Sequence, residues 1–352
     1  MNPAWKHFLQ DAGAEFDADQ VASFGNPDLE RRVVTAGNVF CERSHHGLIA
    51  VRGDDAMAFL QGQFGNDVKQ VTATRAQLSS YCNPKGRMLA TFRLFLRDGV
   101  YYLNLPRALV DPIVQRLRMF VLRAKVTVED ASDTLIRIGV SGPQSDAQIK
   151  DILGDLPQEV DAALEAGKRT VVRIPGPHPR FEIYGELEPM QKLWQGLNVH
   201  SAPVGAGPWA LLDILAGIPV INPETSGLFV PQMANLQLIG AVNFQKGCYP
   251  GQEVVARMQY LGKLKRRMYR AHVEADRVPR PGDPLHAPDA GAGQDIGQVV
   301  NAEAGADGGY ELLAVIQIAN ANTGGVRLWD ETGPPLRLCA LPYPVPAGAN
   351  PR

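Results

Sequence analysis

The stretch Asn243-Phe-Gln-Lys-Gly-Cys-Tyr-Pro-Gly-Gln-Glu-Val254 is the most informative part of this 352-residue chain. Gly247, Pro250 and Gly251 lie close together in it, and residues of these types favour a tight turn. Apolar residues then recur at helical spacing, at Val254, Met258 and Leu261. The stretch therefore predicts a turn that leads directly into a helix.

Cys248 is the chemically distinctive residue of this turn. It precedes the expected helix start by a few positions, and Lys246 lies two residues before it. The partial positive charge of a helix N-terminus and a nearby ammonium group both favour a thiolate over a thiol. Gln252 and Glu253 fall in the first helical turn, where their side chains can satisfy free backbone donors or reach a ligand. These features fit a reactive thiol at Cys248, but without further information an inert buried cysteine is the commoner meaning of such a residue.

The other cysteines do not suggest a metal site or a disulfide scaffold. Cys41, Cys82 and Cys339 are far from Cys248 and from one another. Their spacing matches no common zinc or iron–sulfur pattern, and stable cluster ligation asks for about four ligands. His45 and His46 are adjacent, and adjacent strand residues point to opposite faces, so joint metal ligation is not expected. We predict no stably bound metal.

Composition excludes several classes of protein. The 35 basic and 37 acidic side chains give a formal charge of −2, which argues against a polyanion-coating protein. A basic run at residues 263–267 is more typical of a solvated linker or an acidic-partner contact than of nucleic-acid recognition. No segment has the ~18 apolar residues of a membrane span, and the N-terminus shows no secretory pattern. We expect a cytoplasmic protein with no direct nucleic-acid or membrane binding.

Working outward, turn signals alternate with single helices. Asn83-Pro84-Lys85-Gly86 and Asp98-Gly99 predict two consecutive hairpins, and Leu48–Val51 predicts a buried strand. Asp111-Pro112 predicts the start of a helix whose apolar face is Ile113, Leu117 and Phe120. This order of elements favours an antiparallel α+β architecture over a doubly wound parallel sheet.

The texture changes near Lys265. Beyond it, short strand-like runs alternate with loops rich in Gly, Pro, Asp and Ala, which predicts a small C-terminal β-barrel. We expect an N-terminal helix and link at residues 1–38, an α+β region of two subdomains at 39–265, a barrel at 266–346 and a tail at 347–352.

The cysteine stretch also resembles a known family. Lys246-Gly247-Cys248-Tyr249-x-Gly251-Gln252-Glu253 resembles the signature of the YgfZ family of folate-binding proteins of iron–sulfur enzyme maintenance. Weaker matches to the same family lie at Leu60–Val68, Asn83–Met88, Ala216–Pro219 and Phe229–Leu236. Together the matches cover about residues 39–265.

The resemblance implies the fold of the glycine-cleavage aminomethyltransferase, a ring of three domains around a channel that holds tetrahydrofolate. By resemblance, Cys248 and Lys246 are the candidate reactive residues, and their candidate supports are Gly247, Tyr249, Gly251, Gln252 and Glu253. The candidate folate contacts are Tyr81, Arg93, Asp213, Gln232 and Glu253. The transferases usually carry a glutamate before Ala-Gly that can bind the pterin ring, and this chain has Leu215 there.

The resemblance also implies a function. It implies an accessory protein that supports iron–sulfur cluster assembly or repair in selected enzymes, including those that methylthiolate tRNA, with those enzymes or assembly proteins as partners. The alternative is a tetrahydrofolate-dependent aminomethyltransferase. That chemistry needs a carboxylate to manage proton transfer, and the matching stretch at residues 85–90 contains no acid, so a classical enzyme is not expected.

Overall fold

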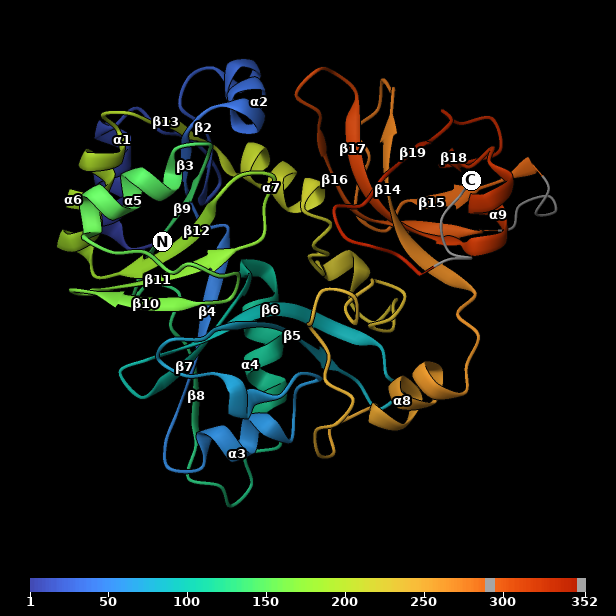
Figure 1. Ribbon diagram of the computed structural model, residues 1–352, viewed down its shortest axis with the longest axis horizontal. Coiled ribbons are helices and arrows are strands. Elements are labelled where there is room, and N and C mark those ends of the chain that lie inside the picture. The colour runs from blue at the N-terminus through green and yellow to red at the C-terminus, as the bar shows by residue number, and fades with distance from the viewer. Residues whose placement is uncertain (289–294, 347–352) are drawn as a thin grey trace. The chain divides into compact units, whose positions relative to one another are not determined.

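The computed structural model describes residues 1–288 and 295–346 (Figure 1). The expected tail at 347–352 lies outside the described residues. The chain divides into two compact units that interleave in sequence. Unit 1 comprises residues 1–60, 68–78 and 92–212, and unit 2 comprises 61–67, 79–91 and 213–352. The predicted domain bounds at 38 and 265 stay a prediction.

Unit 1 contains a six-stranded sheet in the order β10-β11-β12-β9-β3-β13. Its strands are antiparallel except β13, which pairs with β3 in parallel. The strands are β3 (Val39–Glu42), β9 (Ile136–Ser141), β10 (Ala163–Ala166), β11 (Arg169–Ile174), β12 (Arg180–Gly185) and β13 (Ala202–Val204). A hairpin of β1 (Glu15–Asp17) and β2 (Gln20–Ser23) precedes it.

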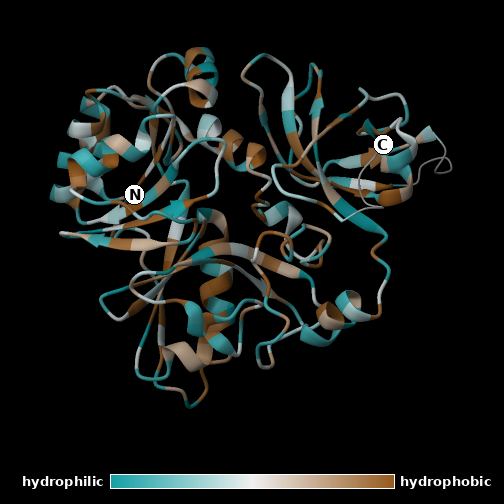
Figure 2. Cartoon of the chain, viewed as in Figure 1, coloured by the Kyte–Doolittle hydropathy of each residue, from teal (hydrophilic) through white to brown (hydrophobic). Residues whose placement is uncertain are grey.

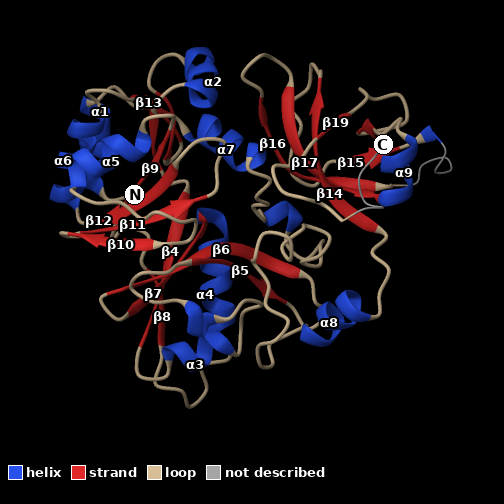
Figure 3. Cartoon of the chain, viewed as in Figure 1, coloured by secondary structure: helices blue, strands red, loops and turns tan. Residues whose placement is uncertain are grey.

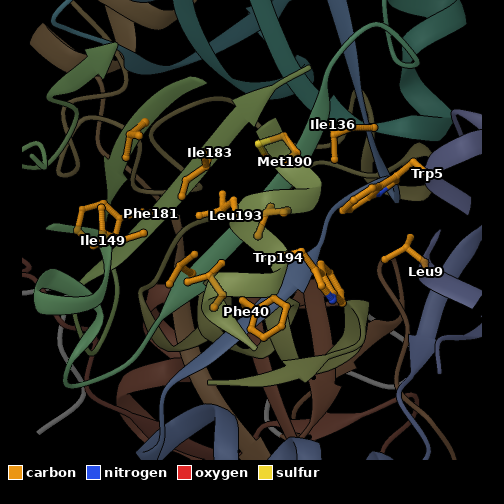
Figure 4. Close-up of a cluster of buried hydrophobic side chains, with 14 of the residues drawn as sticks. Trp5, Leu9, Phe40, Ile136, Ile149, Phe181, Ile183, Met190, Leu193 and Trp194 are labelled. Atoms are coloured by element: carbon orange, nitrogen blue, oxygen red, sulfur yellow. The ribbon is translucent and has the colours of Figure 1, made fainter. Parts of the chain in front are cut away.

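Helices pack on this sheet through their apolar sides. They are α1 (Pro3–Asp11), α2 (Pro27–Ala36), α5 (Ser145–Leu153), α6 (Leu187–Leu197) and α7 (Ala206–Leu215). Trp194 of α6 meets Trp5 and Phe40 edge to face, with ring centroids 5.7 and 4.6 Å apart (Figure 4). The other sides of α1, α2, α5 and α6 carry polar residues, whereas α7 is mostly hydrophobic and has Asp213 as its one charged residue (Figure 2).

The helix starts follow local chemistry. Asn2 accepts hydrogen bonds from the backbone N–H groups of Ala4 and Trp5, and Asn26 accepts one from Leu29. A proline follows each asparagine at the first helical position, where its missing N–H is not needed.

A second, five-stranded sheet has the order β5-β6-β7-β4-β8. Its strands are β4 (His46–Arg52), β5 (Gln77–Cys82), β6 (Met88–Arg97), β7 (Val100–Pro106) and β8 (Thr127–Asp130), with α3 (Ala56–Gln61) and α4 (Val110–Arg118) nearby in sequence. Both predicted hairpins are confirmed. Asp98 and Gly99 adopt φ of +51° and +75°, as a two-residue hairpin turn requires. The buried strand predicted at Leu48–Val51 is confirmed within β4.

One predicted helix differs in detail. α4 begins at Val110, so Asp111 lies inside the first turn instead of capping it. Phe120 lies beyond the helix end and is exposed, and Val114 is buried together with the predicted Ile113 and Leu117. The helix begins earlier because a short 3₁₀ turn, η2 (Arg107–Leu109), leads directly into it.

Unit 2 contains a curled antiparallel sheet in the order β18-β15-β16-β17-β14-β19 (Figure 3). Its strands are β14 (Arg266–Val273), β15 (Pro284–His286), β16 (Gly297–Ala304), β17 (Tyr310–Gln317), β18 (Arg327–Leu328) and β19 (Arg337–Cys339). The other elements here are η3 (Pro223–Thr225), α8 (Gln252–Tyr260) and α9 (Ile318–Thr323), with η1 (Val68–Gln70) in unit 1. The predicted C-terminal barrel is thus confirmed as a half-barrel that is open in its described residues, because β18 and β19 are its two edges. No helix in the described part of the chain is long and apolar enough to cross a membrane.

Candidate functional site: the Cys248 loop

Cys248 lies on a loop of unit 2 that places two exposed residues between two buried ones. Lys246 and Tyr249 are buried at 8% and 7% exposure, whereas Gly247 and Cys248 are exposed. Cys248 is therefore not buried, and its reactivity stays a prediction. The loop holds its flanking residues in the protein and presents the sulfur to solvent.

The Lys246 side chain anchors the loop to residues 61–64. Its Nζ donates hydrogen bonds to the carbonyl oxygens of Gln61, at 2.6 Å, and Phe64. It also lies 4.9 Å from the centroid of the Tyr249 ring, a cation–π geometry. Burial lowers the pKa of Lys246 to about 8, against the opposing attraction of Asp67. The ammonium thus binds the 61–64 segment, so these contacts assign Lys246 a positioning role, beside its predicted influence on Cys248.

Gly251 connects the loop to the helix. It is the N-cap of α8 with φ of +81°, a left-handed conformation that glycine adopts without strain. A Cβ at this position would lie 2.4 Å from the carbonyl oxygen of Asn83 and 2.6 Å from Gly86 Cα. Glycine is therefore required both by the backbone angle and by the close approach of the 83–86 hairpin. The predicted turn followed by a helix is confirmed.

The first turn of α8 braces the loop on its other side. Gln252 Nε2 donates to the carbonyl oxygen of Lys246 at 3.2 Å, and Gln252 N–H donates to Tyr249 O at 3.1 Å. Glu253 is exposed. Gln232 Nε2 donates to Val255 O at 2.7 Å, which ties the 230–236 segment to the same helix. Lys246, Gln252 and Gln232 thus fix the surroundings of the exposed thiol.

The remaining candidate folate residues are distributed over both units. Tyr81 is fully buried in unit 2, where its ring meets Phe64 edge to face at 5.7 Å. Gln232 is buried, and its Oε1 accepts no hydrogen bond from the described residues. Asp213 and Leu215 both lie in α7, two positions apart, so their side chains point in different directions around the helix. The roles of these residues, and of Glu253, as folate contacts stay predictions.

Arg93 belongs instead to a buried polar network in unit 1. It pairs with Asp161, and its Nε lies 3.7 Å from Glu182 Oε2. Glu182 also accepts hydrogen bonds from Arg43 Nη1 at 2.6 Å and from the Tyr184 hydroxyl at 2.5 Å. Burial alone would raise the pKa of Glu182, but Arg43 and Arg93 outweigh it and hold the pKa below its usual value. Glu182 is therefore an ionised carboxylate in the protein interior.

Sequence reasoning missed Glu182, although a signal was present. In the strand Arg180-Phe-Glu-Ile-Tyr-Gly185, polar and apolar residues alternate, which places Arg180, Glu182 and Tyr184 on one face. Both faces of this strand are buried. A carboxylate on a fully buried strand needs charged partners, and it therefore marks an internal polar site.

Asn104 completes this network. Its Nδ2 donates to the Tyr184 hydroxyl at 3.0 Å and lies 3.4 Å from Glu182 Oε2. Asn104 also forms a side-chain hydrogen bond with His46, which opposes the fall in the pKa of that imidazole. A carboxylate and an amide oxygen are acceptors of the kind that a ligand with adjacent N–H donors needs, which is the donor pattern of a pterin ring. Glu182 and Asn104 therefore match the chemistry of the expected folate, which would replace part of their present contacts.

The histidine pair is not arranged as a metal site. His45 and His46 are both buried, and His46 Nδ1 lies 3.2 Å from Arg43 Nη2. Burial, with the adjacent Arg43 charge, lowers the pKa of both imidazoles well below the usual value. The described residues contain no group of three or more metal-binding side chains.

Comparison with known proteins agrees with this architecture. Residues 15–176 match the family described as GCVT N-terminal domain. The glycine cleavage system aminomethyltransferase T of Bartonella henselae superposes with a TM-score of 0.80 over 97% of each chain, at 19% identity. The chain therefore has the aminomethyltransferase fold, as the resemblance implies.

Relatives found by sequence identify the family more narrowly than the fold does. The tRNA-modifying protein YgfZ of Yersinia pestis (strain Pestoides F) is 32% identical over 297 residues, covering 84% of this chain and 89% of the relative. The protein of the same name from Klebsiella pneumoniae is 31% identical over the same share of this chain and 90% of its own. That from Colwellia psychrerythraea is 34% identical over 65% and 69%. Identity at this level over most of both chains shows that this chain belongs to the YgfZ family.

Proposed function

We propose that this protein is a folate-binding accessory factor of tRNA modification that supports iron–sulfur cluster assembly or repair in selected enzymes through the thiol of Cys248. The observation that carries the proposal is the presentation of Cys248 on a loop whose neighbours are anchored. A thiol that serves only packing is usually buried. Membership of a family whose relatives are named tRNA-modifying protein YgfZ supports the same assignment.

The anchored loop suits transfer between proteins. Lys246, Gln252 and Gly251 fix the backbone on both sides of Cys248, so little loop entropy is lost when a partner docks on the sulfur. A single exposed thiol cannot hold a cluster alone, so the proposed partner is an iron–sulfur client enzyme or assembly protein that supplies the other ligands.

The folate part of the proposal rests on the Glu182 network. The Glu182 carboxylate and the Asn104 amide oxygen would accept the N–H donors of the pterin in place of their present partners Tyr184 and His46, and Arg43 would keep that carboxylate ionised. When bound, folate supplies a carrier for a one-carbon group. This assignment gives the carboxylate role to Glu182, since Leu215 cannot fill it.

Complementation tests the thiol. Cells that lack their own YgfZ-type protein would receive wild type, Cys248→Ala or Cys41→Ser, and methylthiolated tRNA would be quantified. Cys41→Ser is the matched control, because Cys41 is buried and its Sγ donates to the carbonyl oxygens of Glu42 and Gly205, which serine can also do. We expect Cys248→Ala to lose at least tenfold of the modification and the control to retain it. Full activity of Cys248→Ala would overturn the proposal.

Calorimetric titration tests folate separately. Wild type, Asn104→Leu and Leu215→Glu would each be titrated with tetrahydrofolate after circular dichroism has confirmed their folding. We expect wild type to bind, Asn104→Leu to bind at least tenfold more weakly, and Leu215→Glu to resemble wild type. Binding only by Leu215→Glu would show that the missing glutamate matters and that Glu182 does not replace it. The calorimetric result does not bear on the thiol proposal, which complementation tests separately.

A further inference from the structure

A cavity of about 270 Å³ lies in unit 2 beside the edge of the C-terminal sheet, away from the residues of the Cys248 loop. Most of its lining residues are apolar in type, but polar and apolar atoms contribute about equally to its surface, and three lining side chains carry polar groups: Tyr269, Tyr343 and Cys339. The apolar lining includes Met268, Leu338, Leu341, Pro344 and Val345. The cavity thus combines apolar side chains with an equal share of polar surface, so it can hold a small molecule that has both an apolar and a polar part.

The cavity arises where a strand pairing stops. β19 pairs with β14 only from Arg270 to His272, and its last residue, Cys339, lies opposite Arg270. Residues 340–345 then leave the ladder, so no strand covers the edge of β14 beside Met268 and Tyr269. The Met268 carbonyl is satisfied by Asn235 Nδ2 at 2.9 Å instead. The cavity therefore lies where β19 no longer pairs with β14.

Arg267, a buried cation on the same strand as the lining residues Met268 and Tyr269, forms no ion pair with the described residues. Arg267 is 8% exposed, and its Nε and Nη1 make no hydrogen bond to the described residues. The electrostatic partners of its guanidinium are Tyr269 and Tyr343, two residues that line the cavity. Burial lowers the pKa of Arg267, which is the direction expected of a guanidinium that lacks an acidic partner. An uncompensated buried charge of this kind is unfavourable.

The two tyrosines differ in their hydrogen bonding. The Tyr343 hydroxyl donates to the Gly217 carbonyl oxygen at 2.9 Å and receives a contact from Asn235 Nδ2 at 3.4 Å. The Tyr269 hydroxyl is buried and has no hydrogen-bond partner within residues 1–288 and 295–346. Positions 267 and 269 of β14 also lie on the same face of the strand. One face of β14 therefore carries the Arg267 guanidinium and the Tyr269 hydroxyl. Both groups have buried atoms that make no hydrogen bond to the described residues.

We propose that this cavity binds a small organic carboxylate, whose charge is met by Arg267 and Tyr269 and whose apolar body occupies the chamber. One buried guanidinium balances one negative charge, which favours a monoanion over a phosphate dianion. Ligand pockets typically measure about 300–1,000 Å³, so this one suits a small metabolite and is too small for a nucleotide or folate. The site is independent of the proposed folate and cysteine sites.

Fluorine NMR of the full chain tests the proposal with 4-fluorobenzoate as the probe and 4-fluorobenzyl alcohol as its neutral counterpart. We expect the carboxylate to bind with a Kd at least tenfold below that of the alcohol. Arg267→Met should abolish this preference, and Tyr269→Phe should weaken binding about threefold to tenfold. Arg337→Met is the matched control, because Arg337 is exposed on β19 of the same sheet.

Cys339 gives a second readout, since its thiol lines the cavity. Alkylation of the Cys339 peptide, followed by mass spectrometry, should slow when 4-fluorobenzoate is present and should not slow in Arg267→Met. Equal binding of the carboxylate by wild type and folded Arg267→Met would overturn the proposal, as would an absence of binding at 10 mM probe. Displacement of the probe by chloride or sulfate at equal concentration would also overturn it, by showing a simple inorganic-anion site.

Discussion

Replacement of Gly251 by alanine tests whether the helix start really determines the geometry of the Cys248 loop. The left-handed backbone at φ of +81° is unfavourable for alanine by about 1–2 kcal/mol. The added Cβ would also approach Asn83 O to 2.4 Å and both N and Cα of Gly86 to 2.6 Å. All three atoms are backbone, so no side-chain rotation relieves the overlap.

The two effects add in magnitude. Overpacking of a well-packed site costs about 1–3 kcal/mol, so the total for Gly251→Ala is about 2–5 kcal/mol. In a unit of this size that corresponds to a fall in Tm of roughly 5–15 °C. The chain offers a matched control at Gly247, where an added Cβ meets nothing within 4 Å. Gly247→Ala should therefore change the stability by no more than about 1 kcal/mol.

Both variants would be compared with wild type by thermal unfolding under circular dichroism and by hydrogen exchange. Exchange in Gly251→Ala should rise in the peptides that cover residues 83–90 and 243–260, because the helix start and the hairpin must separate. A Gly251→Ala protein as stable as Gly247→Ala, with unchanged exchange in both peptides, would refute the steric argument.

Three further outcomes follow from burial and charge. Ellman's reagent should label Cys248 in the native protein but Cys82 only in urea, because Cys82 is buried and its pKa is raised to about 12 by that burial; rapid native labelling of Cys82 would contradict this. Wild type should gain about 1 kcal/mol of stability from pH 7 to 9 through Lys246, since its pKa is about 8 folded and 10.5 unfolded and the unfolded chain then binds more protons. Urea unfolding at both pH values should show that Lys246→Met lacks this gain. An equal change in the free energy of unfolding in wild type and variant would refute the reasoning. Glu182→Gln should lose about 3–5 kcal/mol of stability, because Arg43 is then buried without its counter-charge; an unchanged urea midpoint would count against an ionised network.

Local patterns were sufficient to predict much of the fold. Asn83–Gly86 and Asp98-Gly99 carry the turn residues that their hairpins need, so both could be read without tertiary information. The turn before α8 was predictable for the same reason, because Gly251 is one of the few residue types that its backbone angle admits. The start of α4 was not, because the preceding 3₁₀ turn has no distinctive residue signal.

The candidate site shows where sequence reasoning stops. From the spacing in the motif around Cys248 we expect the Lys246 ammonium, together with the helix start, to favour a thiolate. In the structure Lys246 donates to carbonyl groups of residues 61 and 64, about 180 positions earlier in the chain. A contact over that separation leaves no periodic signal in either segment.

The sequence by itself determined most element types, the turns, a barrel-like C-terminal sheet and the family, because each depends on neighbouring residues or on a linear motif. The tertiary structure alone decided which groups are buried together. Glu182 becomes an ionised interior carboxylate because residues from three other parts of the chain meet it. Arg93 lies in β6, Asn104 lies in β7 and Arg43 follows β3 directly. Arg267 is buried by the folded chain, and its Nε and Nη1 make no hydrogen bond to the described residues. Desolvation and charge pairing depend on distances in space, and these are properties of the folded chain.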